Sequence, residues 1–262
     1  MRAFAFASAA SLFLAAAPTA AAVPQRVASL NLCTDELLLL LAAPAQIASV
    51  THLSHKPAET VLWRSARRYP LNDGSLLSVA QRRPDLVLTM GGGGGDKVGI
   101  ARRLGFRVVD LPYPQSMADI ERSIATVASA LGRAPAGHAL LARTGHLKRT
   151  SPARTVDTVW MGGGGRSVAA TGLAAEWMRL AGLKQRALPG ERISLEQLLT
   201  QPPSLLLRSD YRAGQHSAQQ NWLAHPLARG GRSRTVATDG RRWTCMGPSL
   251  IDEVLRLRRA TA

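Results

Sequence analysis

Short apolar runs alternate with amphipathic stretches along most of the chain, and this alternation limits the possible folds more than any other feature. Strand-like runs cover residues 26–30, 47–50, 85–90 and 107–111, and helical patterns cover residues 34–42, 76–82 and 97–104 between them. Strands that alternate with helices in this way are typical of a parallel sheet covered by helices. The sequence therefore predicts an α/β fold.

The same alternation begins again after a long helical stretch at residues 116–147, which Gly132 and Pro135 interrupt at a candidate kink. Residues 77–88 and 196–207 repeat one pattern, a short helix, a proline seven residues after its start, and an apolar strand. Repetition of one unit indicates two similar lobes. We predict a signal peptide at 1–22, an N-terminal lobe at 23–115, a single long connecting helix at 116–150 and a C-terminal lobe at 151–262.

The first 22 residues have the pattern of a secretory signal peptide. Arg2 precedes an apolar run at residues 3–17, and Ala20 to Ala22 offer a small-residue cleavage site. The run is about 15 residues long, short of the ~20 that a membrane-spanning helix needs. No cysteine follows the cleavage site that would carry a lipid anchor. We expect a cleaved, soluble, periplasmic protein.

The formal charge of +16 would ordinarily suggest a nucleic-acid-binding protein. Cleavage at residue 22 removes Arg2 and lowers the charge by one. The remaining arginines are scattered without interleaved aromatic residues, as at 67–68, 102–103 and 258–259. We therefore expect no nucleic-acid partner. An arginine-rich solvated surface, or attraction to an anionic lipid surface or ligand, both account for the charge.

Two glycine runs follow predicted strands, at residues 91–95 and 162–165. Glycine lets a backbone approach a ligand closely, and ligands bind at the carboxyl ends of strands in open α/β sheets. The phosphate-binding pattern G-x-x-x-x-G-K-[ST] is absent from both runs. The runs are candidate ligand loops or flexible turns.

Cys33, His52 and His55 follow predicted strands and offer an alternative, a soft metal site in a metal-binding protein or enzyme. The hydrolase patterns G-x-S-x-G and H-E-x-x-H are absent. Cys33 and Cys245 are the two cysteines of the chain, and a disulfide between them would close a loop of about 210 residues. A disulfide and two separate packed thiols both remain open.

Several motifs taken together resemble the periplasmic binding proteins of ABC importers that bind cobalamin, haem and ferric siderophores. The motifs are RVASLNLCTDEL at 26–37, IASVTHLSHKP at 47–57, RRPDLVL at 82–88, LGFRVVDL at 104–111 and ISLEQLLTQPPSLLL at 193–207. The resemblance implies two Rossmann-like lobes with a ligand cleft between them. It also implies a monomer without a cofactor that delivers a metal chelate to an inner-membrane permease and catalyses nothing.

The resemblance places the ligand cleft at the loops that follow the strands. The expected ligand-binding residues are Asn31, Leu32, Cys33, His52, Leu53, Gly91, Gly92, Gly93, Gly163, Gly164, Arg208, Asp210, Tyr211, Trp243 and Cys245. Cobalamin binders of this family ring the cleft with aromatic residues, whereas Trp243 is the main aromatic expected near this mouth. Arginines beside a cleft of few aromatics also suit a chelate with carboxylate or hydroxamate arms, so the choice among chelates stays open.

In this family one exposed Glu on each lobe contacts arginines of the permease. Glu196 matches the position on the second lobe, whereas the matching position on the first lobe is Leu77. Glu59 and Asp73 carry charge in the first lobe, but neither matches the motif. We therefore expect docking that relies on Glu196.

Overall fold

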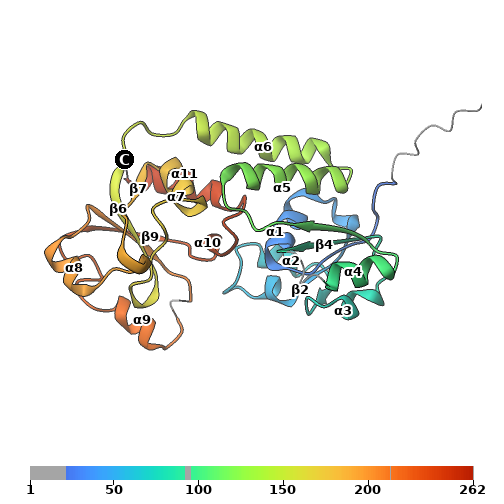
Figure 1. Ribbon diagram of the computed structural model, residues 1–262, viewed down its shortest axis with the longest axis horizontal. Coiled ribbons are helices and arrows are strands. Elements are labelled where there is room, and N and C mark those ends of the chain that lie inside the picture. Colours follow the sequence, from blue (N-terminus) through green and yellow to red (C-terminus); the bar gives the residue numbers. More distant parts are fainter. Residues whose placement is uncertain (1–21, 92–95, 213, 262) are drawn as a thin grey trace, which may run out of the picture.

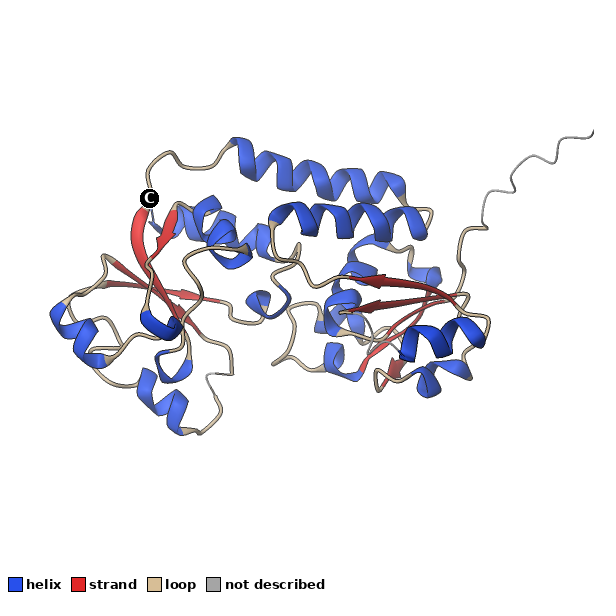
Figure 2. Ribbon diagram, in the orientation of Figure 1, coloured by secondary structure: helices blue, strands red, loops and turns tan. Residues whose placement is uncertain are grey.

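The computed structural model describes residues 22–91, 96–212 and 214–261. The predicted signal peptide thus lies outside the described residues, apart from Ala22. The chain forms two α/β lobes, each built on its own parallel sheet, with a pair of connecting helices over the N-terminal lobe and the junction (Figures 1 and 2).

The N-terminal lobe holds a five-stranded sheet in the order β3-β2-β1-β4-β5, and all its neighbouring strands are parallel. Its strands are β1 (Val27–Ser29), β2 (Ile47–Thr51), β3 (Leu71–Asn72), β4 (Leu86–Met90) and β5 (Arg107–Leu111). Its helices are α1 (Leu32–Leu41), η1 (Pro44–Gln46), η2 (His52–His55), α2 (Trp63–Ala66), α3 (Leu76–Ala80) and α4 (Asp96–Arg103). The buried run of β4 lies between β1 and β5, as expected for a strand covered on both faces.

The C-terminal lobe holds a four-stranded parallel sheet in the order β7-β6-β8-β9. Its strands are β6 (Val156–Met161), β7 (Leu183–Gln185), β8 (Leu205–Ser209) and β9 (Arg234–Thr238). Its helices are η3 (Gly163–Gly165), α7 (Leu173–Leu180), η4 (Pro189–Glu191), α8 (Leu195–Thr200), α9 (Ala218–Leu223), α10 (Arg242–Cys245) and α11 (Leu250–Thr261). The two-lobed α/β architecture predicted from the repeated pattern is confirmed.

The connection between the lobes is a helical hairpin, so the expectation of a single long helix was wrong. Helix α5 (Met117–Ala130) packs beside α6 (Ala134–Arg149). In Figure 1 the pair lies over the N-terminal lobe, and it contacts α7 and α11 of the C-terminal lobe. Gly132 adopts the left-handed conformation, with φ of 67°. Such a residue ends a helix and reverses the chain. A Cβ at position 132 would also lie 2.8 Å from a methyl carbon of Val23, so the turn requires glycine.

One continuous cluster of buried side chains joins the two lobes through the hairpin. It includes Leu38 of the first lobe, Ile124 of α5, and Trp177 and Leu207 of the second lobe. A smaller cluster around Met161 fills the far side of the second sheet. The lobes are therefore packed together rather than linked only by the chain. Within the described residues, no helix has the length and apolar character to cross a membrane.

Candidate functional site

The loops at the carboxyl ends of the strands of both lobes face the junction between the lobes (Figure 1). On the first lobe these loops lead from β1 into α1, from β2 into η2, and from β4 to Gly91. On the second lobe they lead from β6 into η3, from β8 to Tyr211, and from β9 into α10. The predicted placement of the candidate loops on this edge of each sheet thus agrees with the fold.

A disulfide between Cys33 and Cys245 joins the lobes at this junction, with Cα atoms 5.2 Å apart. Cys33 lies in the first turn of α1, where the Asn31 side chain accepts a hydrogen bond from its backbone N–H. Cys245 ends α10. The structure thus answers the question that the sequence left open. The cavity beside the disulfide measures only about 10 Å³, so side chains of both lobes fill the junction there.

The disulfide removes the thiolate on which the alternative metal site depended. The Nε2 atom of His55 lies 3.1 Å from the carbonyl oxygen of Tyr69, which occupies that side of its ring. Over residues 22–91, 96–212 and 214–261, no group of three or more His, Cys, Asp or Glu side chains could hold a metal ion. The structure therefore offers no support for a site of Cys33, His52 and His55.

The carboxylate of Glu36 forms a second link between the lobes, one helical turn after Cys33. Glu36 is buried, and its Oε1 accepts a hydrogen bond of 2.6 Å from the backbone N–H of Ser249, just before α11. A Cβ on Gly247 would lie 2.8 Å from the same oxygen, so only glycine lets the backbone approach this closely. Burial raises the pKa of Glu36, and the Ser249 N–H and the nearby Arg242 partly offset this effect.

We predict that Glu36→Gln makes the free energy of unfolding less dependent on pH. An unfolded Glu titrates near pH 4.5, and the higher pKa in the folded protein means that the folded state binds this proton more tightly. The resulting stabilisation is complete below pH 4.5 and is lost as pH rises through the folded pKa. Urea unfolding between pH 4.5 and 8 should show a smaller loss for the variant than for the wild type, and parallel curves would contradict the prediction.

A cluster of Glu59, Tyr211 and Arg212, which we call the inter-lobe cluster, links the loops on the two sides of the junction. The Tyr211 hydroxyl donates to Oε2 of Glu59 at 2.8 Å, and Nη2 of Arg212 donates to Oε1 at 2.7 Å. Nearby, Nη1 of Arg241 donates to the carbonyl oxygen of Pro57 at 2.9 Å. Tyr211 is among the residues predicted for the site, whereas Arg212 and the contact with Glu59 are not, because the partners lie more than 150 residues apart.

Asp35 holds the loop that carries His52 and Leu53. Its carboxylate is fully buried and accepts hydrogen bonds from the Thr51 backbone N–H at 3.0 Å and from the Ser54 hydroxyl at 2.6 Å. Burial raises the pKa of Asp35, whereas these hydrogen bonds oppose the rise. Asp35 therefore holds η2 in place through hydrogen bonds to Thr51 and Ser54.

Two predicted ligand residues point into the second lobe instead of standing at the cleft mouth. Trp243 is only 5% exposed, its indole N–H donates to the Thr238 hydroxyl at 2.8 Å, and its ring packs against Trp160. Arg208 donates from Nη2 to the carbonyl oxygen of Leu223. The expectation of Trp243 as an aromatic at the mouth does not match its burial, which follows from its contacts with Thr238 at the end of β9 and with Trp160 of β6.

The other predicted site residues differ in their burial and in their contacts. Leu32 and Leu53 are half-buried on the first lobe, and Asp210 is exposed while accepting a hydrogen bond from the Gly240 N–H. Gly91 directly follows β4, whereas Gly92 and Gly93 lie outside the described residues. Gly163 and Gly164 form η3 and pack against Gln219 of α9.

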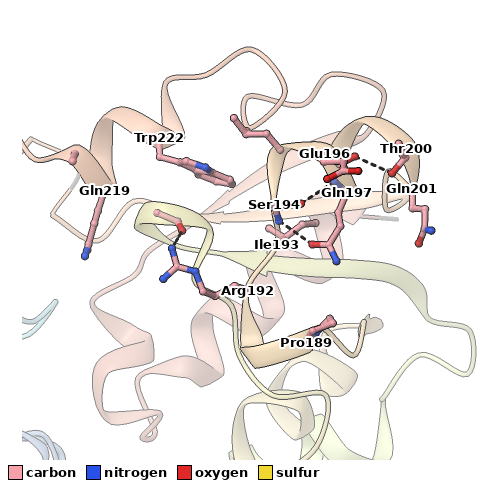
Figure 3. A pocket seen from close by; sticks show the side chains of 13 residues that line it. Pro189, Arg192, Ile193, Ser194, Glu196, Gln197, Thr200, Gln201, Gln219 and Trp222 are labelled. Atoms are coloured by element: carbon pink, nitrogen blue, oxygen red, sulfur yellow. Dashed lines mark hydrogen bonds between the residues drawn. The ribbon is translucent and has the colours of Figure 1, made fainter.

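An open cavity of about 1000 Å³ lies at the surface of the second lobe, between η3, α8 and α9 (Figure 3). Arg192 and Trp222 stand on one side of it and Glu196 and Gln197 on the other. Arg192 donates to the carbonyl oxygen of Gly164 at 2.6 Å, which fixes its guanidinium at the rim. The sequence predicts a ligand cavity between the lobes and not this one, which is formed in part by α9, a helix that the sequence pattern does not indicate.

Glu196 and Leu77 occupy equivalent positions in the two lobes. Each is the second residue of a short helix, α8 or α3, that begins after a serine cap and leads into a central strand. Glu196 is exposed, and Leu77 is 81% exposed. The repeated pattern read from the sequence therefore corresponds to equivalent surface positions.

This chain is similar to known proteins in its structure, whereas its sequence alone matches none of them. No protein-family model matches the chain, and no curated protein matches its sequence. The vitamin B12 binding protein BtuF of Vibrio cholerae is 16% identical, with a TM-score of 0.64 over 90% of this chain and 96% of that protein. A periplasmic haem binding protein of Pseudomonas aeruginosa is 20% identical, with a TM-score of 0.63 over 90% and 92%.

A third similar structure is the siderophore binding protein BauB, bound to acinetobactin and ferric iron. It is 13% identical to this chain, with a TM-score of 0.68 over 91% of this chain and 94% of that protein. All three comparisons cover both lobes. The chain therefore has the two-lobed fold of the periplasmic binding proteins for vitamin B12, haem and siderophores.

Proposed function

We propose that this chain is the periplasmic substrate-binding component of an ABC importer, and that it captures a metal chelate between its lobes. The observation that carries the proposal is the meeting of the carboxyl edges of two parallel sheets at one junction. Ligands bind at this edge of an open α/β sheet, and small-molecule sites prefer the interface between domains. Similar structures that bind vitamin B12, haem and a ferric siderophore support the same class of ligand.

The disulfide supports a location outside the cytoplasm. Disulfides persist in oxidising compartments such as the bacterial periplasm and are rare in the cytosol. The signal-like residues 1–22 agree with export. We propose a monomeric protein that catalyses nothing, because its role is to hold a chelate and to release it to a permease in the inner membrane.

We propose that the chelate contacts the strand-end loops of both lobes. His52, Leu53 and Gly91 stand on the first lobe, and Gly163, Gly164 and Tyr211 on the second. Asn31 and Leu32 lie at the start of α1, next to the disulfide of Cys33 and Cys245. Opening of the inter-lobe cluster would give a chelate access to these loops.

The proposed function predicts that one chelate class raises the melting temperature. A ligand that binds only the folded protein at 100 times its dissociation constant adds roughly 2.7 kcal/mol to the free energy of unfolding. For a chain of this size that corresponds to a rise of about 5–10 °C. Thermal shift with cobalamin, haem and ferric siderophores measures it. If none of them changes the melting temperature, the proposed function is wrong.

The equivalence of Glu196 and Leu77 predicts that permease docking relies on the second lobe. An exposed carboxylate accelerates encounter with a basic permease surface, whereas leucine offers apolar contact only. Glu196→Ala should lower uptake through the reconstituted permease severalfold at unchanged ligand affinity, and Leu77→Ala serves as the matched control with little effect. Equal transport by wild type and Glu196→Ala would contradict docking, and a parallel loss of ligand binding would place Glu196 in the ligand site.

A further inference from the structure

Both oxygens of the Glu59 carboxylate are bound by donors of the opposite lobe. Tyr211 donates to one oxygen at 2.8 Å and Arg212 to the other at 2.7 Å. The Glu59 side chain is 11% exposed, and the Arg212 side chain is 41% exposed. One carboxylate of the first lobe therefore takes two directed donors of the second lobe, close to solvent.

The two donors are held in place by contacts that do not involve Glu59. The Tyr211 backbone N–H donates to the Ser209 hydroxyl, and its carbonyl oxygen accepts from Gln220 at 3.2 Å. Arg212 adopts a left-handed backbone, with φ of 57°, and its guanidinium lies 5.0 Å from the centre of the Tyr211 ring. Non-glycine residues in this conformation are strained, and they concentrate at binding sites.

The chemistry of this pair fits a carboxylate. The phenolic hydroxyl and the guanidinium both act as donors toward Glu59. Charge-assisted hydrogen bonds to a carboxylate are stronger than neutral ones. The site also belongs to the strand-end loop after β8, at the edge where ligands bind. The contact with Glu59 therefore shows that this pair of donors binds a carboxylate.

We propose that Tyr211 and Arg212 form the carboxylate-binding part of the ligand site, and that Glu59 competes with the ligand for these two donors. The proposal rests on the proposed function and narrows the ligand to chelates that carry a carboxylate. The carboxylate of such a chelate takes the place of the Glu59 carboxylate on Tyr211 and Arg212, and the two loops then separate. A chelate without a carboxylate, such as cobalamin, gains nothing from this exchange.

The first test uses free citrate as the probe, so that it does not depend on any chelate. Thermal shift at constant ionic strength compares wild type, Glu59→Ala and Glu59→Ala/Arg212→Ala. We expect Glu59→Ala to bind citrate at least about fivefold more tightly than wild type, and the double variant to lose this gain. Asp252→Ala is the matched control, because it removes an equal charge from an exposed ion pair with Arg143 that includes no residue of the inter-lobe cluster.

Citrate affinity of Glu59→Ala no higher than that of wild type would overturn the proposal, as would a gain that persists without Arg212. Glu59→Gln provides a second variant if the alanine variant does not fold, and its gain should be smaller because an amide oxygen still accepts from Arg212. In the second test, Glu59→Ala should bind ferric citrate more tightly and cobalamin equally. An equal gain for both chelates would show simple loosening of the loops and would also overturn the proposal.

The outcomes separate this inference from the proposed function. If the wild type binds a chelate but Glu59→Ala has the citrate affinity of the wild type, the inference fails and the proposed function stands. If citrate behaves as expected and no chelate binds to any variant, the carboxylate site stands and the proposed function fails.

Discussion

Removal of the disulfide is expected to lower the free energy of unfolding by roughly 5 kcal/mol, the largest effect predicted for this chain. The bond closes a loop that spans a sequence separation of 212 residues, and in the chain-entropy model the stabilisation grows with the length of the closed loop. Cys33→Ala/Cys245→Ala removes the cross-link without leaving a reactive thiol. Urea unfolding of the variant and the wild type at equal pH measures the difference.

Reduction of the wild type by a thiol reagent is the matched control, because it breaks the same bond without changing any side chain beyond the two sulfurs. It should destabilise the protein to a similar extent. A loss below about 1 kcal/mol in both experiments would mean that residual structure restricts the unfolded chain about as strongly without the cross-link, against the chain-entropy argument.

Trp177→Ala is expected to cost about 3–5 kcal/mol, the second largest effect. Trp177 is 0% exposed in α7 and belongs to the buried cluster that joins the lobes. Its indole N–H donates to the carbonyl oxygen of Met246 at 2.8 Å, next to Cys245. The substitution therefore leaves a large cavity and an unpaired carbonyl beside the inter-lobe disulfide. Denaturant unfolding measures the loss.

Trp177→Phe separates the two causes, because it keeps a ring in the cavity and removes the hydrogen bond. It should cost clearly less than Trp177→Ala, with about 1–3 kcal/mol from the unsatisfied carbonyl of Met246. Trp222→Ala, at a half-buried position on the rim of the second-lobe cavity, should cost less than Trp177→Ala. A similar loss for all three variants would contradict the assignment of Trp177 to the shared core.

Strands in the middle of each sheet were predictable from the sequence because their side chains are buried on both faces. β4, which lies between β1 and β5 and is buried along its whole length, matches the predicted run within one residue at each end. β3 and β7 were missed, since they are two and three residues long and each pairs with a single neighbour. A strand this short carries too few residues for a period-2 pattern, so its pairing partner determines it.

Local sequence also determined where the candidate loops begin, because each follows a buried apolar strand. It did not determine which residues meet across the junction. The contacts of Cys33 with Cys245 and of Glu59 with Tyr211 join positions more than 150 residues apart, and no spacing rule connects them. The turn at Gly132 folds the connecting segment back on itself, and this return brings the second lobe against the first. Two lobes and their strand-end loops thus follow from local patterns, whereas their cross-links follow from packing of the whole chain, because only the folded backbone brings such distant groups within bonding distance.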